Sequence, residues 1–131
     1  MFGLKKNLIK SMIKIETISN EPGELKLYAK QIADVEDEYK IYEHFVLDAL
    51  KLLGGIKGVK VDYDRALVTI MYDENEVSAS QIYRWIDILV DISLDYKDFI
   101  KDNWEKDVNM VWAKMKPILE KRVMEVKNKR R

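Results

Sequence analysis

Hydrophobic and polar residues alternate in the middle of the chain in a way that predicts an antiparallel hairpin. Val59, Val61 and Tyr63 are separated by single charged residues, which is the period of a half-buried strand. Residues 64–66 are a short Asp-Arg-Ala turn, and residues 67–72 are a second run rich in β-branched and aromatic side chains. We therefore expect two strands joined by a tight turn.

Helical periodicity lies on both sides of this hairpin. Apolar side chains recur at helical spacing over residues 35–53, and the Gly-Gly pair that follows is typical of a helix C-terminus. Ser78 and Gln81 have the spacing of a capping box, in which each side chain bonds the backbone of the other residue. The pair predicts that a second helix begins at Ser78 and continues to about residue 90.

Other segments extend this pattern in both directions. Alternation over residues 24–32 predicts a strand before the first helix. Residues 92–96 fit either a short fourth strand or a continuing helix. Residues 96–116 have helical spacing, and Pro117 either kinks this helix or starts a last one over residues 118–126.

The element order is strand, helix, hairpin, helix. It predicts the α+β class, with a ferredoxin-like antiparallel sheet of three or four strands and helices on one face. We divide the chain into an N-terminal amphipathic helix at residues 1–18, the ferredoxin-like domain at residues 22–96, and a C-terminal helical extension with a basic tail at residues 97–131.

Three sequence segments in and around the hairpin resemble those of a known family. They are Leu-Leu-Gly-Gly-Ile-Lys-Gly-Val-Lys-Val-Asp at residues 52–62, Val-Thr-Ile-Met-Tyr-Asp at residues 68–73, and Val-Ser-Ala-Ser-Gln-Ile at residues 77–82. With them, the chain resembles the heavy-metal-associated domain of the copper-chaperone type over about residues 22–92. The Pro-Gly at residues 22–23, just before a Leu-x-Leu strand, is similar to a cysteine-less branch of that family.

The resemblance implies a fold and a loose association with metal transport or membranes. The family binds soft metal through Cys-x-x-Cys between its first strand and first helix, whereas this chain has Gln-Ile-Ala-Asp-Val-Glu-Asp-Glu at residues 31–38 and no cysteine. Copper(I) and zinc sites of that kind require thiolates. We therefore expect no copper or zinc carriage by the family's mechanism.

The N-terminal segment, residues 1–16, fits a basic amphipathic helix. One half of its helical wheel collects Phe2, Leu4, Leu8, Ile9, Met12, Ile13 and Ile15, and the other half collects Lys6, Asn7, Lys10, Ser11 and Lys14. Such a helix can lie in a membrane interface or contact a partner. The alternative is a helix that packs on its own domain or on a second copy.

Charge and composition limit the function classes. The formal net charge is zero, but both ends of the chain are basic and the middle is acidic. Without cysteine, disulfides and thiol chemistry are excluded. No apolar run reaches the roughly 18–20 residues that span a bilayer, and no secretory signal is evident. We expect a cytoplasmic protein, with the inner face of the membrane as an alternative location.

Candidate ligands for a metal or haem are few. The carboxylates that could hold a hard cation are Asp34, Glu36, Asp37 and Glu38. They lack the regular spacing of a calcium loop, and helix capping also explains them. His44 is the only histidine and could ligate haem, although a histidine without a second ligand is more often a surface or boundary residue. No cofactor is predicted.

No nucleophile–base pair, phosphate loop or pair of catalytic carboxylates can be argued, so the sequence predicts no enzyme. The acidic middle also argues against nucleic acid as a partner. The function predicted from sequence is a non-catalytic interaction protein of degenerate heavy-metal-associated type that docks on a membrane surface or a metal transporter. The alternatives are a self-associating structural dimer, and a hard-metal or haem sensor.

Overall fold

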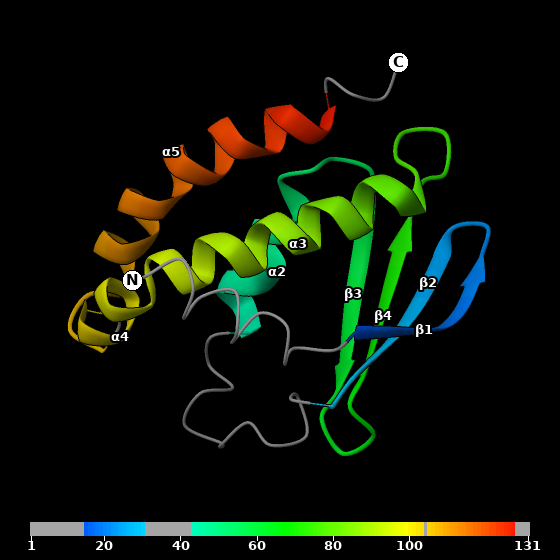
Figure 1. Cartoon of the computed structure of the whole chain (residues 1–131), viewed down its shortest axis with the longest axis horizontal. Helices are drawn as coiled ribbons and strands as arrows, with labels where there is room; N and C mark the ends of the chain where they lie inside the picture. The colour runs from blue at the N-terminus through cyan, green and yellow to red at the C-terminus, as the bar shows by residue number, and fades with distance from the viewer. Residues whose placement is uncertain (1–14, 31–42, 104, 128–131) are drawn as a thin grey trace.

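The protein combines a four-stranded antiparallel sheet with helices on one side of it (Figure 1). The structure is a computed structural model, and it describes residues 15–30, 43–103 and 105–127. The elements are β1 (Ile15–Glu21), β2 (Glu24–Ala29), α2 (Glu43–Lys51), β3 (Ile56–Asp62), β4 (Leu67–Tyr72), α3 (Ala79–Asp95), α4 (Lys97–Asn103) and α5 (Val108–Lys127). The α+β class predicted from the sequence is confirmed.

The strands lie in the order β1-β2-β4-β3. The predicted hairpin is present as β3 and β4, and β2 pairs with the other edge of β4. Because side chains alternate along a strand, Leu25 and Leu27 of β2 share a face with Ile70 of β4. All three are buried on the side of the helices. The opposite face carries polar residues such as Lys26 and Thr69, which are paired across the two strands.

The fourth strand comes from the N-terminal side of the sheet, which corrects an expectation. The predicted helix over residues 1–18 falls mostly outside the described residues, but Ile15–Glu21 forms strand β1. A tight turn at Pro22 and Gly23 brings β1 back along β2, and Gly23 has the positive φ of 81° that this turn requires. Pairing with the free edge of β2 therefore replaced helical periodicity in the last residues of that segment.

The alternative strand at residues 92–96 does not form. Residues 92–95 are the end of α3, and the Tyr96 amide closes that helix by donating to the Ile92 carbonyl at 3.0 Å. The alternation of Ile92 and Leu94 fits a strand, but Ile92 is also one helical turn after the buried Ile88. Packing of that helical face in the core stabilises the helix.

The capping box predicted at the start of this helix is confirmed. The Gln81 amide donates to the Ser78 hydroxyl at 3.1 Å, and the Ser78 amide donates to the Gln81 side-chain oxygen at 2.9 Å. The two bonds satisfy amides that the first turn of a helix leaves without an intrahelical acceptor.

The C-terminal segment forms two helices, where the sequence indicated one helix up to Pro117. α5 begins after Asp107, whose side chain accepts a bond from the Met110 amide at 3.1 Å and so caps the helix. Pro117 lies inside α5 and neither ends nor restarts it. Since Pro117 and Ala113 are both exposed, the Ala113 carbonyl that loses its usual amide donor faces solvent.

One hydrophobic core unites the sheet, α2, α3 and α5. The buried residues of α5 recur every three or four positions along one face, and they are Val111, Met115, Leu119, Val123 and Val126. They belong to the same cluster as Ile70 of β4 and Ile82 of α3. The predicted C-terminal extension is therefore packed into the core of the sheet domain, and Figure 1 shows α5 lying along α3 on its side away from the sheet.

Trp85 lies at the centre of this core. Its side chain is fully buried, and its indole N–H donates to the carbonyl oxygen of Ala49 at 3.0 Å. Ala49 is in α2, so this bond joins the two helices that face the sheet. Ala49 is itself buried.

Replacing Trp85→Phe should lower the free energy of unfolding by about 1–3 kcal/mol, because a buried hydrogen bond is lost and a small cavity opens. Urea denaturation followed by far-ultraviolet circular dichroism measures this change. A loss below about 0.5 kcal/mol, the level of an ordinary surface substitution, would show that the bond between α2 and α3 is unimportant.

Two adjacent glycines connect α2 to β3, and their surroundings differ. Gly54 and Gly55 both have positive φ, at 83° and 80°. A Cβ added to Gly54 would meet nothing within 4 Å, whereas one added to Gly55 would lie 2.7 Å from Cγ1 of Val77. Val77 is buried, so it has little room to move.

The two alanine variants form a matched pair. Gly54→Ala should cost only the left-handed backbone penalty, about 1–2 kcal/mol. Gly55→Ala should cost a further 1–3 kcal/mol or so, because the new methyl group overpacks against Val77. Equal losses in urea denaturation of the two variants would contradict the close packing of this loop on Val77.

Candidate functional site

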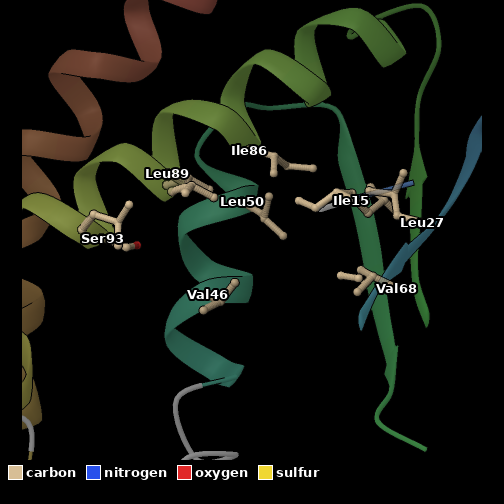
Figure 2. Close-up of a pocket in the computed structure, with 12 residues that line it drawn as sticks. Ile15, Leu27, Val46, Leu50, Val68, Ile86, Leu89 and Ser93 are labelled. Carbon is tan, nitrogen blue, oxygen red and sulfur yellow. The ribbon is translucent and has the colours of Figure 1, made fainter. Parts of the chain in front are cut away.

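A pocket lies between the sheet and helices α2 and α3 (Figure 2). Its cavity volume is about 310 Å³. The residues that line it are Ile15, Leu27, Ala29, Val46, Leu50, Val68, Ile70, Ile86, Leu89, Val90, Ser93 and Leu94. All twelve belong to the described part of the chain, and eleven of them are apolar.

Strand and helix periods place these side chains together. Leu27 and Ala29 are two residues apart on β2, as are Val68 and Ile70 on β4, so each pair projects from the same face of the sheet. Ile15 is paired with Ala29 and extends that face onto β1. The sheet therefore supplies one continuous apolar wall.

The helices supply the opposite wall. Val46 and Leu50 lie one turn apart on α2. On α3 the lining positions are 86, 89, 90, 93 and 94, which is the spacing of one helical face. Figure 2 shows the side chains of Ile86 and Leu50 extending from their helices toward the sheet.

The hollow follows from how α3 is rotated about its axis. Trp85, Ile88 and Ile92 of α3 are buried in the core and are not among the residues that line the pocket. Part of the wall is made of the shorter side chains Ala29 and Val68. A space lined in this way by apolar groups is suited to an apolar ligand.

A hydrogen bond fastens the edge strand beside the pocket. The Thr17 hydroxyl on β1 and the Tyr83 hydroxyl on α3 are hydrogen-bonded to each other. Thr17 is two residues along the strand from Ile15, and Tyr83 is three residues along the helix from Ile86. The bond therefore holds β1, and with it the Ile15 part of the wall, against α3.

Replacing Tyr83→Phe removes this bond and should leave the fold intact. Amide hydrogen exchange in β1 should accelerate several-fold, because an exposed hydrogen bond contributes on the order of 1 kcal/mol. The matched control is Tyr28→Phe, since Tyr28 alternates with the pocket residues Leu27 and Ala29 and so lies on the other face of the sheet. Equal exchange rates in the two variants would show that the Thr17–Tyr83 bond does not hold β1.

A second, smaller hollow of about 230 Å³ lies between the loop after α2 and the start of α3. Glu76 and Lys127 are its charged lining residues, and the others are Leu53, Gly54, Gly55, Val77 and Gln81. It offers one carboxylate and one ammonium group, which do not form a set of metal ligands. The larger pocket is therefore the stronger candidate site.

Most of the residues singled out from the sequence lie outside the part of the chain that the structure describes. Outside the described residues lie the acidic candidates Asp34, Glu36, Asp37 and Glu38, and the N-terminal set Phe2, Lys6, Leu8, Ile9, Lys10, Met12, Ile13 and Lys14. His44 is in the first turn of α2. Within the described ranges, no three histidine or acidic side chains lie close enough together to hold a metal ion.

The pocket was not predicted from the sequence, although the apolar pattern of α3 contains a signal for it. Leu89 and Val90 both line the pocket and are only partly buried. α3 has more apolar residues than one core-facing stripe needs. A helix with two apolar faces indicates two apolar neighbours, which here are the core and the pocket.

The comparisons with known proteins add no information about the site. No protein-family model, curated protein or solved structure matches the chain. Among the described residues, no helix combines the length and apolar character needed to cross a membrane.

Proposed function

We propose that the protein is a non-catalytic binding protein for a small apolar ligand held between the sheet and helices α2 and α3. The observation that carries the proposal is the pocket of about 310 Å³ with eleven apolar lining residues. This volume is at the lower end of the range of about 300–1,000 Å³ that is typical of small-molecule sites. A single hydrocarbon chain or a compact ring system fits that size class.

The lining residues support binding rather than catalysis. Ser93 is the one polar side chain among the twelve, and the lining set contains no histidine, acid, lysine or arginine that could activate its hydroxyl. A serine nucleophile requires a base within hydrogen-bonding reach.

The driving force for such a ligand is the removal of its hydrocarbon surface from water. Each buried methylene group contributes about 0.8 kcal/mol. Two further carbons should therefore tighten binding by roughly 10- to 20-fold, until the cavity is full. Longer chains should then gain no more, and that limit measures the length of the pocket.

The test uses N-phenyl-1-naphthylamine, an uncharged dye whose fluorescence rises in apolar surroundings. Wild-type protein should bind it with saturation. Val46→Trp should weaken binding at least tenfold, because Val46 lines the pocket and the indole would fill it. The control Val108→Trp makes the same change on α5, away from the pocket, and the two valines are similarly exposed at 49% and 44%.

Two results would overturn the proposal. One is the absence of saturable dye binding by the wild-type protein. The other is equal weakening by Val46→Trp and Val108→Trp, which would place the dye elsewhere on the surface. Far-ultraviolet circular dichroism of both variants checks that the fold is retained, as expected for substitutions at exposed helix positions.

We also propose that the strands and helices have a ferredoxin-like arrangement. The order β2-α2-β3-β4-α3, with β4 between β2 and β3, supports a ferredoxin-like arrangement in which β2 and β3 are parallel and joined by a helix. β1 occupies the edge of β2 that a strand after α3 would otherwise take. In this reading the chain is a cysteine-less relative of the heavy-metal-associated domain that binds an apolar ligand in place of a metal.

A further inference from the structure

The sheet wall of the pocket is buried at one end and partly exposed at the other. Because β2 and β4 are antiparallel, Ile70 lies opposite Leu25, Leu27 lies opposite Val68, and Ala29 lies at the far end of β2. Ile70 and Leu27 are buried, whereas Val68 and Ala29 are only partly buried. Burial along this wall therefore decreases from Ile70 toward Ala29.

Helix α2 shows the same gradient in the same direction. Leu50 is buried, whereas Val46, one turn earlier, is exposed. A short turn after α2 leads into β3, whose first residue Ile56 pairs with Tyr72, two residues beyond Ile70. The Leu50 end of α2 therefore lies toward the buried end of the sheet wall. Figure 2 shows Val46 near the start of α2 and Leu50 one turn further along.

Helix α3 and strand β1 complete the exposed end. α3 begins beside the turn that follows α2, so Ile86 lies toward the buried end of the pocket and Ser93 lies away from it. Ile86 is partly buried and Ser93 is exposed. Ile15 of β1 is paired with Ala29 and is also exposed. The pocket thus has a closed end at Ile70 and an open end on the side of Val46.

A pocket with one open end restricts where a ligand can carry a polar group. The closed end is lined by apolar side chains, and a hydroxyl or charged group buried there would lose its hydrogen bonds to water without replacement. Ser93, the one polar lining residue, lies at the open end. A polar group at one terminus of the ligand can therefore stay in water, while the rest of the ligand must be hydrocarbon.

We propose that the pocket binds the unsubstituted tail of a single-chain amphiphile, which enters between Val46 and Ser93 with its terminal methyl group first. Ile70 and Leu50 form the closed end and limit the length of the bound tail. The head group stays in water at the open end, so selection acts on the tail. The inference rests on the proposed function, because it names the ligand class and its orientation in the same pocket.

The first experiment tests whether one end is closed. Decan-1-ol and decane-1,10-diol, each below its solubility limit, compete with N-phenyl-1-naphthylamine for the wild-type protein. The alcohol can insert its methyl end, whereas the diol must bury one hydroxyl among apolar side chains. The diol should need at least about ten times the concentration to displace the dye. Equal displacement would mean that both ends of the ligand reach water, and it would reject a closed end.

The second experiment locates the closed end with primary alcohols from hexan-1-ol to dodecan-1-ol. Ile70→Val removes one methyl group there, so the first alcohol beyond the wild-type length limit should bind about three- to fourfold tighter, the effect of burying one more methylene group. The matched control Ile15→Val makes the same change at the open end and should leave the limit unchanged. Leu50→Ala is a larger deletion at the closed end and should extend the limit further. Far-ultraviolet circular dichroism checks that each variant is folded.

The outcomes separate this inference from the proposed function. If Ile70→Val and Leu50→Ala keep the wild-type length limit, or if Ile15→Val shifts it equally, the assignment of the closed end is wrong. If the alcohols fail to displace bound dye, the pocket takes ring compounds and not chains, so the inference fails while the binding site remains. Failure of the dye itself to bind would overturn the proposed function and this inference together.

Discussion

The contact between Trp85 and Ala49 determines how the rest of the structure is arranged. The indole ring is fully buried, and its hydrogen bond to the Ala49 carbonyl fixes the rotation of α3 relative to α2. With Trp85 in that position, Ile88 and Ile92 are buried in the core that α5 shares, and Ile86, Leu89 and Val90 face the sheet. Because a helix is rigid, fixing the direction of one side chain fixes the directions of all the others. The burial of Trp85 therefore decides which side chains of α3 face the pocket.

The pocket is a consequence of that rotation and has a cost. Apolar surface that lines an open hollow forgoes contacts that a filled core would provide. Among the residues that the structure describes, no buried side-chain nitrogen or oxygen lacks a hydrogen-bond partner. A ligand in the pocket between the sheet and helices α2 and α3 could recover the missing contacts.

The edge strand connects the sheet to this site. β1 extends the sheet beyond β2, contributes Ile15 to the pocket wall, and is tied to α3 through Thr17 and Tyr83. Its register shifts between Thr17 and Ser19, where a bulge interrupts the ladder. Bulges at the edge of a sheet discourage the pairing of that edge with another chain.

The sequence alone determined the elements whose signals are local. The hairpin of β3 and β4, the capping box at Ser78, the glycine turn after α2 and the α+β class were all predicted, because short-range periodicity and backbone bonds specify them. Tertiary contacts decided the rest. Ile15–Glu21 became a strand because β2 had a free edge, residues 92–95 stayed helical because Ile92 packs in the core, and α5 joined that core. The pocket could not be predicted from the sequence. It depends on which face of α3 is directed toward the sheet, and the packing of Trp85 between the helices decides that direction.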